Sequence, residues 1–175
     1  MKDKKLLSDI KEYLKCYEDQ VLEDWYELIR HISVSETGEG IETCCDWIQK
    51  KMEEIGIQVT KYSVKPAPVL VGRFGNDPEK KTVLIYAHYD VKPAGERKLW
   101  HSDPFVPTVS DGKVYARGSA DNKSPLMAHL KALEYFIRRK MEVPVNVIFV
   151  FEGDEECGSR GLEEFLAEHR TELAA

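Results

Sequence analysis

Two short apolar runs, each ending abruptly in polar residues, are the features that most strongly constrain the fold of this chain. The first is 82–90 (TVLIYAHYD), which follows the turn-forming sequence 75–78 (GNDP) and ends in His88 and Asp90. Its β-branched and aromatic residues are typical of strands. Alternate residues of a strand point to the same face, so His88 and Asp90 are expected on one side. The run therefore predicts a buried strand with a histidine and a carboxylate at its C-terminal end, where α/β sheets place their sites.

The second run is 145–151 (VNVIFVF), and the acidic sequence 152–156 (EGDEE) follows it. A continuous apolar run predicts a central strand, which we expect beside the first. Carboxylates clustered at the end of a buried strand repel one another unless a cation neutralises them. The cluster therefore favours a functional site over a solvated acidic loop.

A loop between the two runs, 117–123 (RGSADNK), leads into an amphipathic helix. Ser124 is the expected N-cap of this helix and Pro125 its first residue. Asp121 precedes the helix N-terminus, where an anionic side chain is favourable. This position suits either a capping aspartate or a metal ligand, and the local sequence does not decide between them.

The rest of the chain shows helical and strand periodicities in alternation, which predicts one α/β domain. The last helix is expected to turn Leu162, Phe165 and Leu166 inward, and Asp111-Gly112 indicates a hairpin turn. The expected helices are 6–29, 41–55, 124–137 and 159–168, and the further strands are 57–64 paired with 69–74, and 107–109 paired with 114–116.

Composition excludes several classes of partner. The 175 residues carry a formal net charge of −6, which argues against nucleic acid or an acidic membrane surface. No apolar run reaches the roughly 20 residues of a membrane span, and the N-terminus lacks the apolar core of a secretory signal. The four cysteines show no CxxC spacing and are expected to be reduced core thiols. A cytoplasmic location is expected.

The polar ends of the two strands and the loop between them should converge on one site. Its members are His88, Asp90, Asp121, Glu155 and Glu156. One imidazole and several carboxylates without cysteine suit zinc, manganese or another borderline divalent ion. A carboxylate can bridge two ions about 3.5–4 Å apart, and such a pair activates a water and polarises a carbonyl.

Several motifs of the chain resemble those of a known enzyme family. They are 88–91 (HYDV), 100–105 (WHSDPF), 115–118 (YARG), 121–123 (DNK), and 155–156 (EE) followed by 158–159 (GS). In this order they resemble the co-catalytic zinc peptidases, which include aminoacylase, carboxypeptidase G and carnosinase-type dipeptidases. The dipeptidase branch is the most similar. The resemblance implies an α/β fold with a three-layer α/β/α mixed sheet.

The resemblance also implies a role for each site residue. His88 would ligate one metal ion, with Asp90 as the residue that orients it. Asp121 would bridge both ions, and a cis peptide bond would follow it. Glu156 would ligate the second ion, while Glu155 would be the general base that takes a proton from water and passes it to the leaving amine.

The implied cofactor is a pair of zinc ions, with manganese or cobalt as alternatives, and the implied substrate is a dipeptide or an N-acyl amino acid. A homodimer is implied for the full-length enzyme. Ser124 departs from the glycine that dipeptidases usually have there. A further acidic ligand, a lid or dimerisation domain and a late histidine ligand are not found. Residues 1–175 are therefore expected to be the N-terminal portion of a catalytic domain, incomplete and inactive or very weak alone.

Two other functions are compatible with parts of the sequence. A truncated homologue could serve as a non-catalytic module that binds a partner through exposed apolar faces. Glu155 argues against this, because a binding module needs no general base beside a metal ligand. Metal-dependent phosphoryl transfer is a third reading, but the chain lacks a glycine loop that would cradle phosphate.

Overall fold

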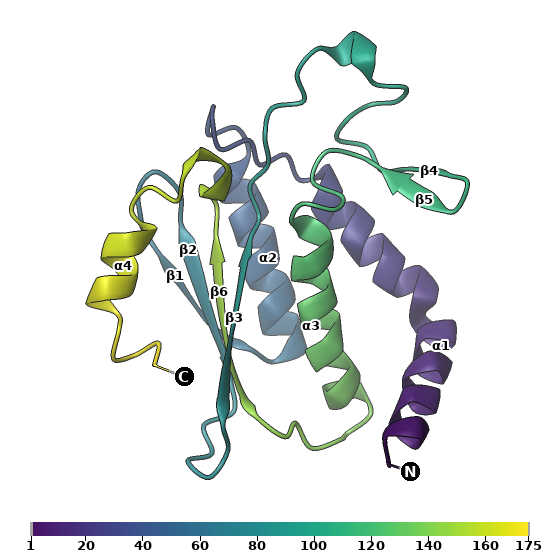
Figure 1. Ribbon diagram of the computed structural model, residues 1–175, viewed down its shortest axis with the longest axis vertical. Helices are drawn as coiled ribbons and strands as arrows, with labels where there is room; N and C mark the ends of the chain where they lie inside the picture. The colour runs from purple at the N-terminus through teal and green to yellow at the C-terminus, as the bar shows by residue number, and fades with distance from the viewer. Residues whose placement is uncertain (1, 175) are drawn as a thin grey trace.

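A four-stranded mixed sheet forms the centre of the computed structural model, which describes residues 2–174 (Figure 1). The strand order is β1-β2-β6-β3. The pairs β1–β2 and β2–β6 are antiparallel, whereas β3 and β6 are parallel. The strands are β1 Gln58–Tyr62, β2 Val69–Phe74, β3 Thr82–His88 and β6 Asn146–Glu152.

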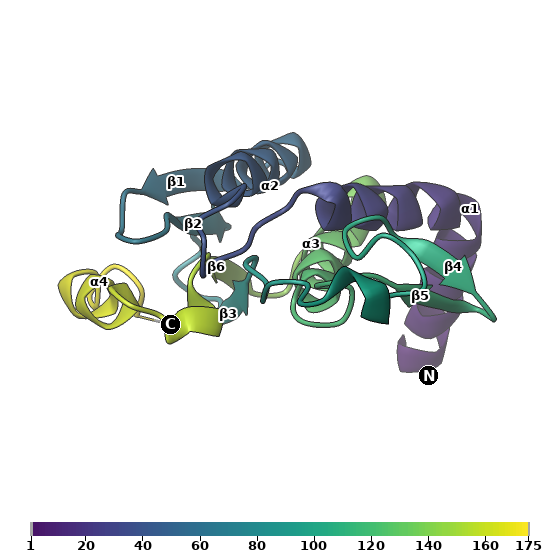
Figure 2. The ribbon, with the colours of Figure 1, turned by 90° about the horizontal axis from the view of Figure 1, so that it is seen from above.

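Helices cover both faces of this sheet, so the predicted three-layer α/β/α arrangement is confirmed (Figure 2). On one face lie α1 (Lys2–Arg30), α2 (Ile41–Ile55) and α3 (Lys123–Arg138). The core between these helices and the sheet contains residues such as Ile48, Leu126 and Phe149. On the other face, α4 (Leu162–Glu168) packs Phe165 against Val69 and Val150.

The smaller elements lie at one end of the sheet, where β3 and β6 finish. A two-stranded hairpin, β4 (Thr108–Ser110) and β5 (Lys113–Tyr115), stands away from the layers together with a 3-10 helix, η1 (Arg97–Leu99) (Figure 1). A second 3-10 helix, η2 (Glu155–Cys157), follows β6. The predicted hairpin is thus confirmed, with Asp111 and Gly112 at positive φ in its turn. No helix within residues 2–174 has the length and apolarity of a membrane span.

The expectation that residues 82–90 form a buried strand is only partly correct. The end of β3 is buried, but Val83, Leu84 and Tyr86 are 42%, 39% and 45% exposed. The reason is topological: among the strands of residues 2–174, β3 pairs only with β6 and forms one edge of the sheet. An apolar run identifies a strand, but it does not reveal whether both edges of that strand are paired.

Three local expectations about helices and cysteines are also wrong. Helix α3 begins at Lys123, so Ser124 and Pro125 lie in its first turn, and Asn122 is the N-cap without a side-chain hydrogen bond. Leu166 on α4 is 39% exposed instead of inward. Cys44 and Cys45 are buried as expected, whereas Cys16 is exposed.

Candidate metal centre

The polar ends of the two apolar runs meet at one edge of the sheet. The parallel register of β3 and β6 pairs His88 with Glu152. The backbone N–H of Tyr89 continues this pairing by donating to the Glu152 carbonyl at 2.8 Å. Parallel strands bring their carboxyl ends to the same side of a sheet, and the sequences that follow them therefore share one site.

His88 is the centre of this site. Its side chain is 6% exposed, and its Nδ1 lies 3.3 Å from Asp90 Oδ1. Its Nε2 lies 3.1 Å from Asp121 Oδ1 and 3.6 Å from Glu155 Oε2. Burial opposes protonation of the ring, but the hydrogen bond and charge of Asp90 and the two other carboxylates outweigh it and raise the pKa of His88 to about 9.

Asp90 joins the ends of both strands. Its side chain is fully buried, and its Oδ1 and Oδ2 accept the backbone N–H groups of Glu155 at 3.1 Å and Glu156 at 3.0 Å. Burial raises the pKa of the Asp90 carboxyl, but hydrogen bonds from His88 and Ser35 and from the Glu156 amide leave it below its ordinary value. Asp90 therefore fixes the ring of His88 and the start of η2 together.

Asp121 and Glu155 approach His88 from the solvent side. Their side chains are 75% and 42% exposed. The peptide bond between Asp121 and Asn122 is cis, as the resemblance implied. The structure thus brings together four of the five predicted site residues, with one buried carboxylate on Nδ1 of the histidine and two accessible ones near Nε2.

Glu156 makes a different contact. Its side chain is 17% exposed and its Oε2 lies 3.6 Å from Lys92 Nζ, which also donates to the Glu156 carbonyl. Within residues 2–174, no group of three or more His, Cys, Asp or Glu side chains is arranged to hold a metal ion. Glu156 is therefore placed beside the cluster by its backbone, while its carboxylate pairs with a lysine.

The acidic sequence at the end of β6 and just after it does not need a cation at every carboxylate. Glu152 accepts hydrogen bonds from Tyr86 Oη at 2.5 Å and Ser159 Oγ at 2.7 Å. Asp154 pairs with Arg160 through Nε at 2.9 Å and Nη2 at 2.7 Å. The prediction that the cluster as a whole requires a cation is wrong for these two, because Tyr86 and Ser159 donate hydrogen bonds to Glu152 and the Arg160 guanidinium neutralises Asp154.

Sequence reasoning missed the polar residues beneath the site. Ser33, Ser35 and Lys123 are all buried, and Ser33 Oγ donates to the Tyr89 carbonyl at 2.7 Å. The polar stretch after α1 predicts only a loop. Lys123 belongs to a motif that carries the resemblance, but nothing in its local sequence indicates that it is buried.

The donor types at this edge fit a divalent cation. An imidazole whose far nitrogen is held by a buried carboxylate is the usual arrangement of a metal-binding histidine. The accessible carboxylates of Asp121 and Glu155 beside Nε2 are ligands or bases suited to zinc and manganese. The donor types at this edge are therefore compatible with a divalent cation.

Comparison with known proteins gives consistent matches. The model of peptidase family M20/M25/M40 matches residues 84–175. The Cys-Gly metallodipeptidase of Schizosaccharomyces pombe is 43% identical over 120 residues, which cover 66% of this chain and 25% of that protein. The human Beta-Ala-His dipeptidase is 44% identical over 103 residues, covering 59% of this chain and 20% of the relative.

Solved structures match the same fold. Human carnosine dipeptidase 1 superposes with a TM-score of 0.88 and 31% identity, over 93% of this chain and 38% of that one. An M20 family metallo-carboxypeptidase from Sulfolobus solfataricus gives a TM-score of 0.84 and 34% identity, over 89% of this chain and 35% of the other. The chain spans about a quarter of the length of the curated Cys-Gly metallodipeptidases that it matches. With a family model that matches more than half of its residues, the chain belongs to peptidase family M20/M25/M40.

Proposed function

We propose that residues 1–175 are the N-terminal portion of the catalytic domain of a metal-dependent dipeptidase, which hydrolyses a peptide or amide bond. The observation that carries the proposal is the set of carboxylates around His88. Buried Asp90 contacts Nδ1, and the carboxylates of Asp121 and Glu155 lie near Nε2. The names of the relatives support the reaction class. A lid or dimerisation domain and the rest of the catalytic domain would belong to the longer protein.

His88, Asp121 and Glu156 are the residues that would hold two divalent ions, zinc first and manganese or cobalt as alternatives. When bound, such ions lower the pKa of a water molecule and polarise the carbonyl of the scissile bond. Binding by Glu156 requires its carboxylate to leave Lys92. Because Lys92 is half-exposed, that ion pair contributes little to stability and is readily exchanged.

Asp90 and Glu155 have roles of their own in this proposal. Asp90 keeps the Nδ1 side of His88 occupied, so that Nε2 faces the accessible carboxylates. Glu155 is the general base, because its carboxylate is accessible while its backbone is anchored on Asp90. A base so placed can accept the proton of an attacking water and deliver it to the leaving amine.

Zinc calorimetry on the chelator-stripped chain tests the site. The site variant is His88→Ala with Glu156→Ala, and the matched control is His129→Ala with Glu163→Ala, which changes the same residue types at exposed positions. We expect weak binding by the native chain and the control and none by the site variant. Equal binding by all three would exclude these ligands, and no binding by any would show that residues 1–175 do not assemble the site.

Hydrolysis assays test the remaining part of the proposal. Cys-Gly and β-Ala-His are the first substrates to try, because the relatives are named for them. We expect little or no turnover by the chain alone. Each ion would be held only by the shared Asp121 and by one further residue, His88 or Glu156. Metal-dependent turnover that Glu155→Gln abolishes would contradict this expectation while supporting the assignment of the base.

The proposed setting of the full-length enzyme is a cytoplasmic homodimer acting on dipeptides or N-acyl amino acids. All four cysteines carry free thiols, and the two buried ones, Cys44 and Cys45, have raised pKa values because burial disfavours the thiolate. Buried, reduced thiols such as these two suit a reducing compartment.

A non-catalytic binding module is the second candidate function. The observation that favours it is the apolar strand β3, where Leu84 and Tyr86 point to the same face and are exposed. Light scattering tests this candidate, because a binding module is expected to self-associate or to bind a partner through that strand. A monodisperse monomer at high concentration would count against it.

A further inference from the structure

A short segment between α1 and α2 supports the site from below. Residues 31–35 run beside the chain that leaves β3, where Val34 forms a parallel bridge with Val91. The Val91 N–H donates to the Ser33 carbonyl at 2.8 Å, and Ser33 Oγ donates to the Tyr89 carbonyl at 2.7 Å. The 31–35 segment therefore holds the backbone on both sides of Asp90.

The same segment is tied to the loop that carries Asp121. Lys123 is 1% exposed, and its Nζ donates to the His31 carbonyl at 2.5 Å. Its own N–H donates to the Gly118 carbonyl at 3.2 Å, which closes the loop over residues 118–123. Burying an amino group is costly, and a lysine that is buried for one backbone acceptor indicates a specific role.

Close packing joins this loop to the chain after β3. Gly118 has a φ of +78°, and a Cβ added there would lie 2.6 Å from Val91 Cγ1 and 3.4 Å from Lys123 Cδ. The loop thus has no room to move toward Val91, and the stem of Lys123 fills the space beside it. The positions of the Asp90 and Asp121 backbones are therefore linked through the 31–35 segment and Lys123.

We propose that Lys123 is a positioning residue, which ties the Asp121 loop to the 31–35 segment and so sets the placement of Asp121 against His88. The significance of that placement for metal binding rests on the proposed function. The positioning itself does not, because it concerns contacts within the metal-free chain.

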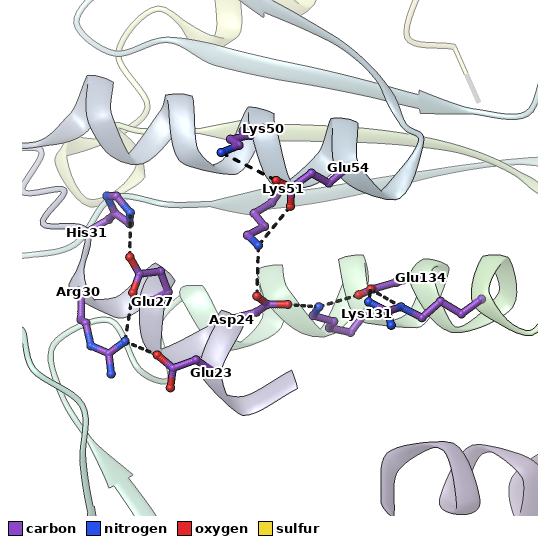
Figure 3. Close-up of polar contacts among 11 residues, drawn as sticks. Glu23, Asp24, Glu27, Arg30, His31, Lys50, Lys51, Glu54, Lys131 and Glu134 are labelled. Carbon is purple, nitrogen blue, oxygen red and sulfur yellow. Dashed lines mark hydrogen bonds and ion pairs between the residues drawn. The ribbon is translucent and has the colours of Figure 1, made fainter. Parts of the chain in front are cut away.

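Amide hydrogen exchange and the ring nitrogen signals of His88, both measured by NMR on the metal-free chain, test the proposal. The variant is Lys123→Met, which keeps the length of the stem and removes the donor. Lys131→Met is the matched control, because Lys131 is also on α3 and 13% exposed but pairs with Asp24 and Glu134 (Figure 3). The reporters are the amides of Val91, Leu126 and Glu156. Their protection from exchange is compared with that of the Phe149 amide on β6.

In Lys123→Met, we expect protection of the three site amides to fall by about tenfold more than that of Phe149, together with a shift of the His88 Nε2 signal. In Lys131→Met, the site amides should keep their protection relative to Phe149 and the ring signal should not move. A uniform loss in Lys123→Met, or unchanged site amides and ring signal, would overturn the proposal, since a merely structural lysine weakens all amides alike.

A second variant covers the case in which Lys123→Met does not fold. Lys123→Gln can still donate to the His31 carbonyl, although its reach is shorter, and it should lose less protection at the same amides. Native-like protection at every reporter would show that a donor to the His31 carbonyl is enough to hold the loop, whereas an equal loss at the site amides and at Phe149 would overturn the proposal. Zinc titration of the same variants separates the two proposals, because the exchange pattern can hold in a chain that binds no zinc.

Discussion

Asp90 shows how one residue can fix a site. It is fully buried, and its two oxygens accept the amides of Glu155 and Glu156 while Oδ1 lies 3.3 Å from His88 Nδ1. Hydrogen bonds to a charged acceptor contribute about 1.5–3 kcal/mol each, more than neutral ones. At the scale of the residue, the same carboxylate therefore contributes to folding and orients the proposed ligand.

Asp90→Asn keeps the shape of the side chain but removes its charge and one acceptor oxygen. One of the amides of Glu155 and Glu156 would then face an NH₂ group in a buried place. We expect the free energy of unfolding to fall by about 2–4 kcal/mol, measured by urea denaturation. Asp111→Asn, in the exposed hairpin turn, is the control and should change it by less than about 0.5 kcal/mol. Equal effects of the two changes would contradict the anchoring role.

Ionic contacts connect the helical elements to one another. Asp24 of α1 pairs with Lys51 of α2 at 3.3 Å and with Lys131 of α3, which also pairs with Glu134 at 2.6 Å (Figure 3). Glu134 in turn pairs with Arg138 at 2.6 Å. The side chains of Asp24 and Glu134 are only 17% and 10% exposed, so this network crosses the contact between three helices and is partly protected from solvent.

The Asp24 network predicts a pH dependence of stability. Burial raises the pKa of the Asp24 carboxyl, but hydrogen bonds and charges from Lys131 and Lys51 outweigh it and leave the pKa lowered. The contribution is therefore present above the unfolded pKa of about 3.9 and is lost as pH falls through the lower folded value. Asp24→Asn should reduce the free energy of unfolding by about 1–2 kcal/mol at pH 7. It should also make that free energy depend less on pH in the acid range. Chemical denaturation across pH checks this, with exposed Asp19→Asn as the control.

The contact between α2 and β2 depends on a glycine. A Cβ at Gly72 would lie 2.2 Å from Met52 Cε and 2.9 Å from Ile57 Cγ2. We expect Gly72→Ala to destabilise the chain by about 1–3 kcal/mol through overpacking. Combined with Met52→Ala, it should cost less than the sum of the single changes, because the shortened side chain leaves room for the methyl group. Strict additivity in thermal or urea unfolding would contradict this account.

At the scale of the whole molecule, the layers cover the sheet unevenly. Helix α4 packs over β1, β2 and β6, but the same face of β3 remains open (Figure 2). Leu84 and Tyr86 on that strand are 39% and 45% exposed, beside backbone groups that no strand within residues 2–174 pairs. An exposed apolar edge strand is a template for association.

Leu84→Lys tests this edge. A charge on an edge strand opposes pairing with another chain, so the variant should self-associate less than the native chain does. Leu166→Lys, which changes a leucine of the same 39% exposure on α4, is the control. Light scattering over a concentration series checks both. If the two variants associate equally, the edge of β3 is not the surface responsible.

Local sequence patterns were sufficient for most elements. Helix α2 ends at Gly56 because glycine readily adopts the positive φ of 94° that closes the helix. The hairpin turn at Asp111-Gly112 is likewise confirmed. These features depend on side-chain periodicity and turn chemistry, which a few neighbouring residues determine.

Tertiary structure alone decided which groups meet across long separations. It paired Glu156 with Lys92, Glu152 with Tyr86, and Lys123 with the carbonyl of His31. It also left β3 at the edge of the sheet. The sequence by itself determined the elements and brought His88 and Asp90 to one strand end, because those depend on local geometry. Partners and exposure depend on how the elements pack, and no local pattern records that packing.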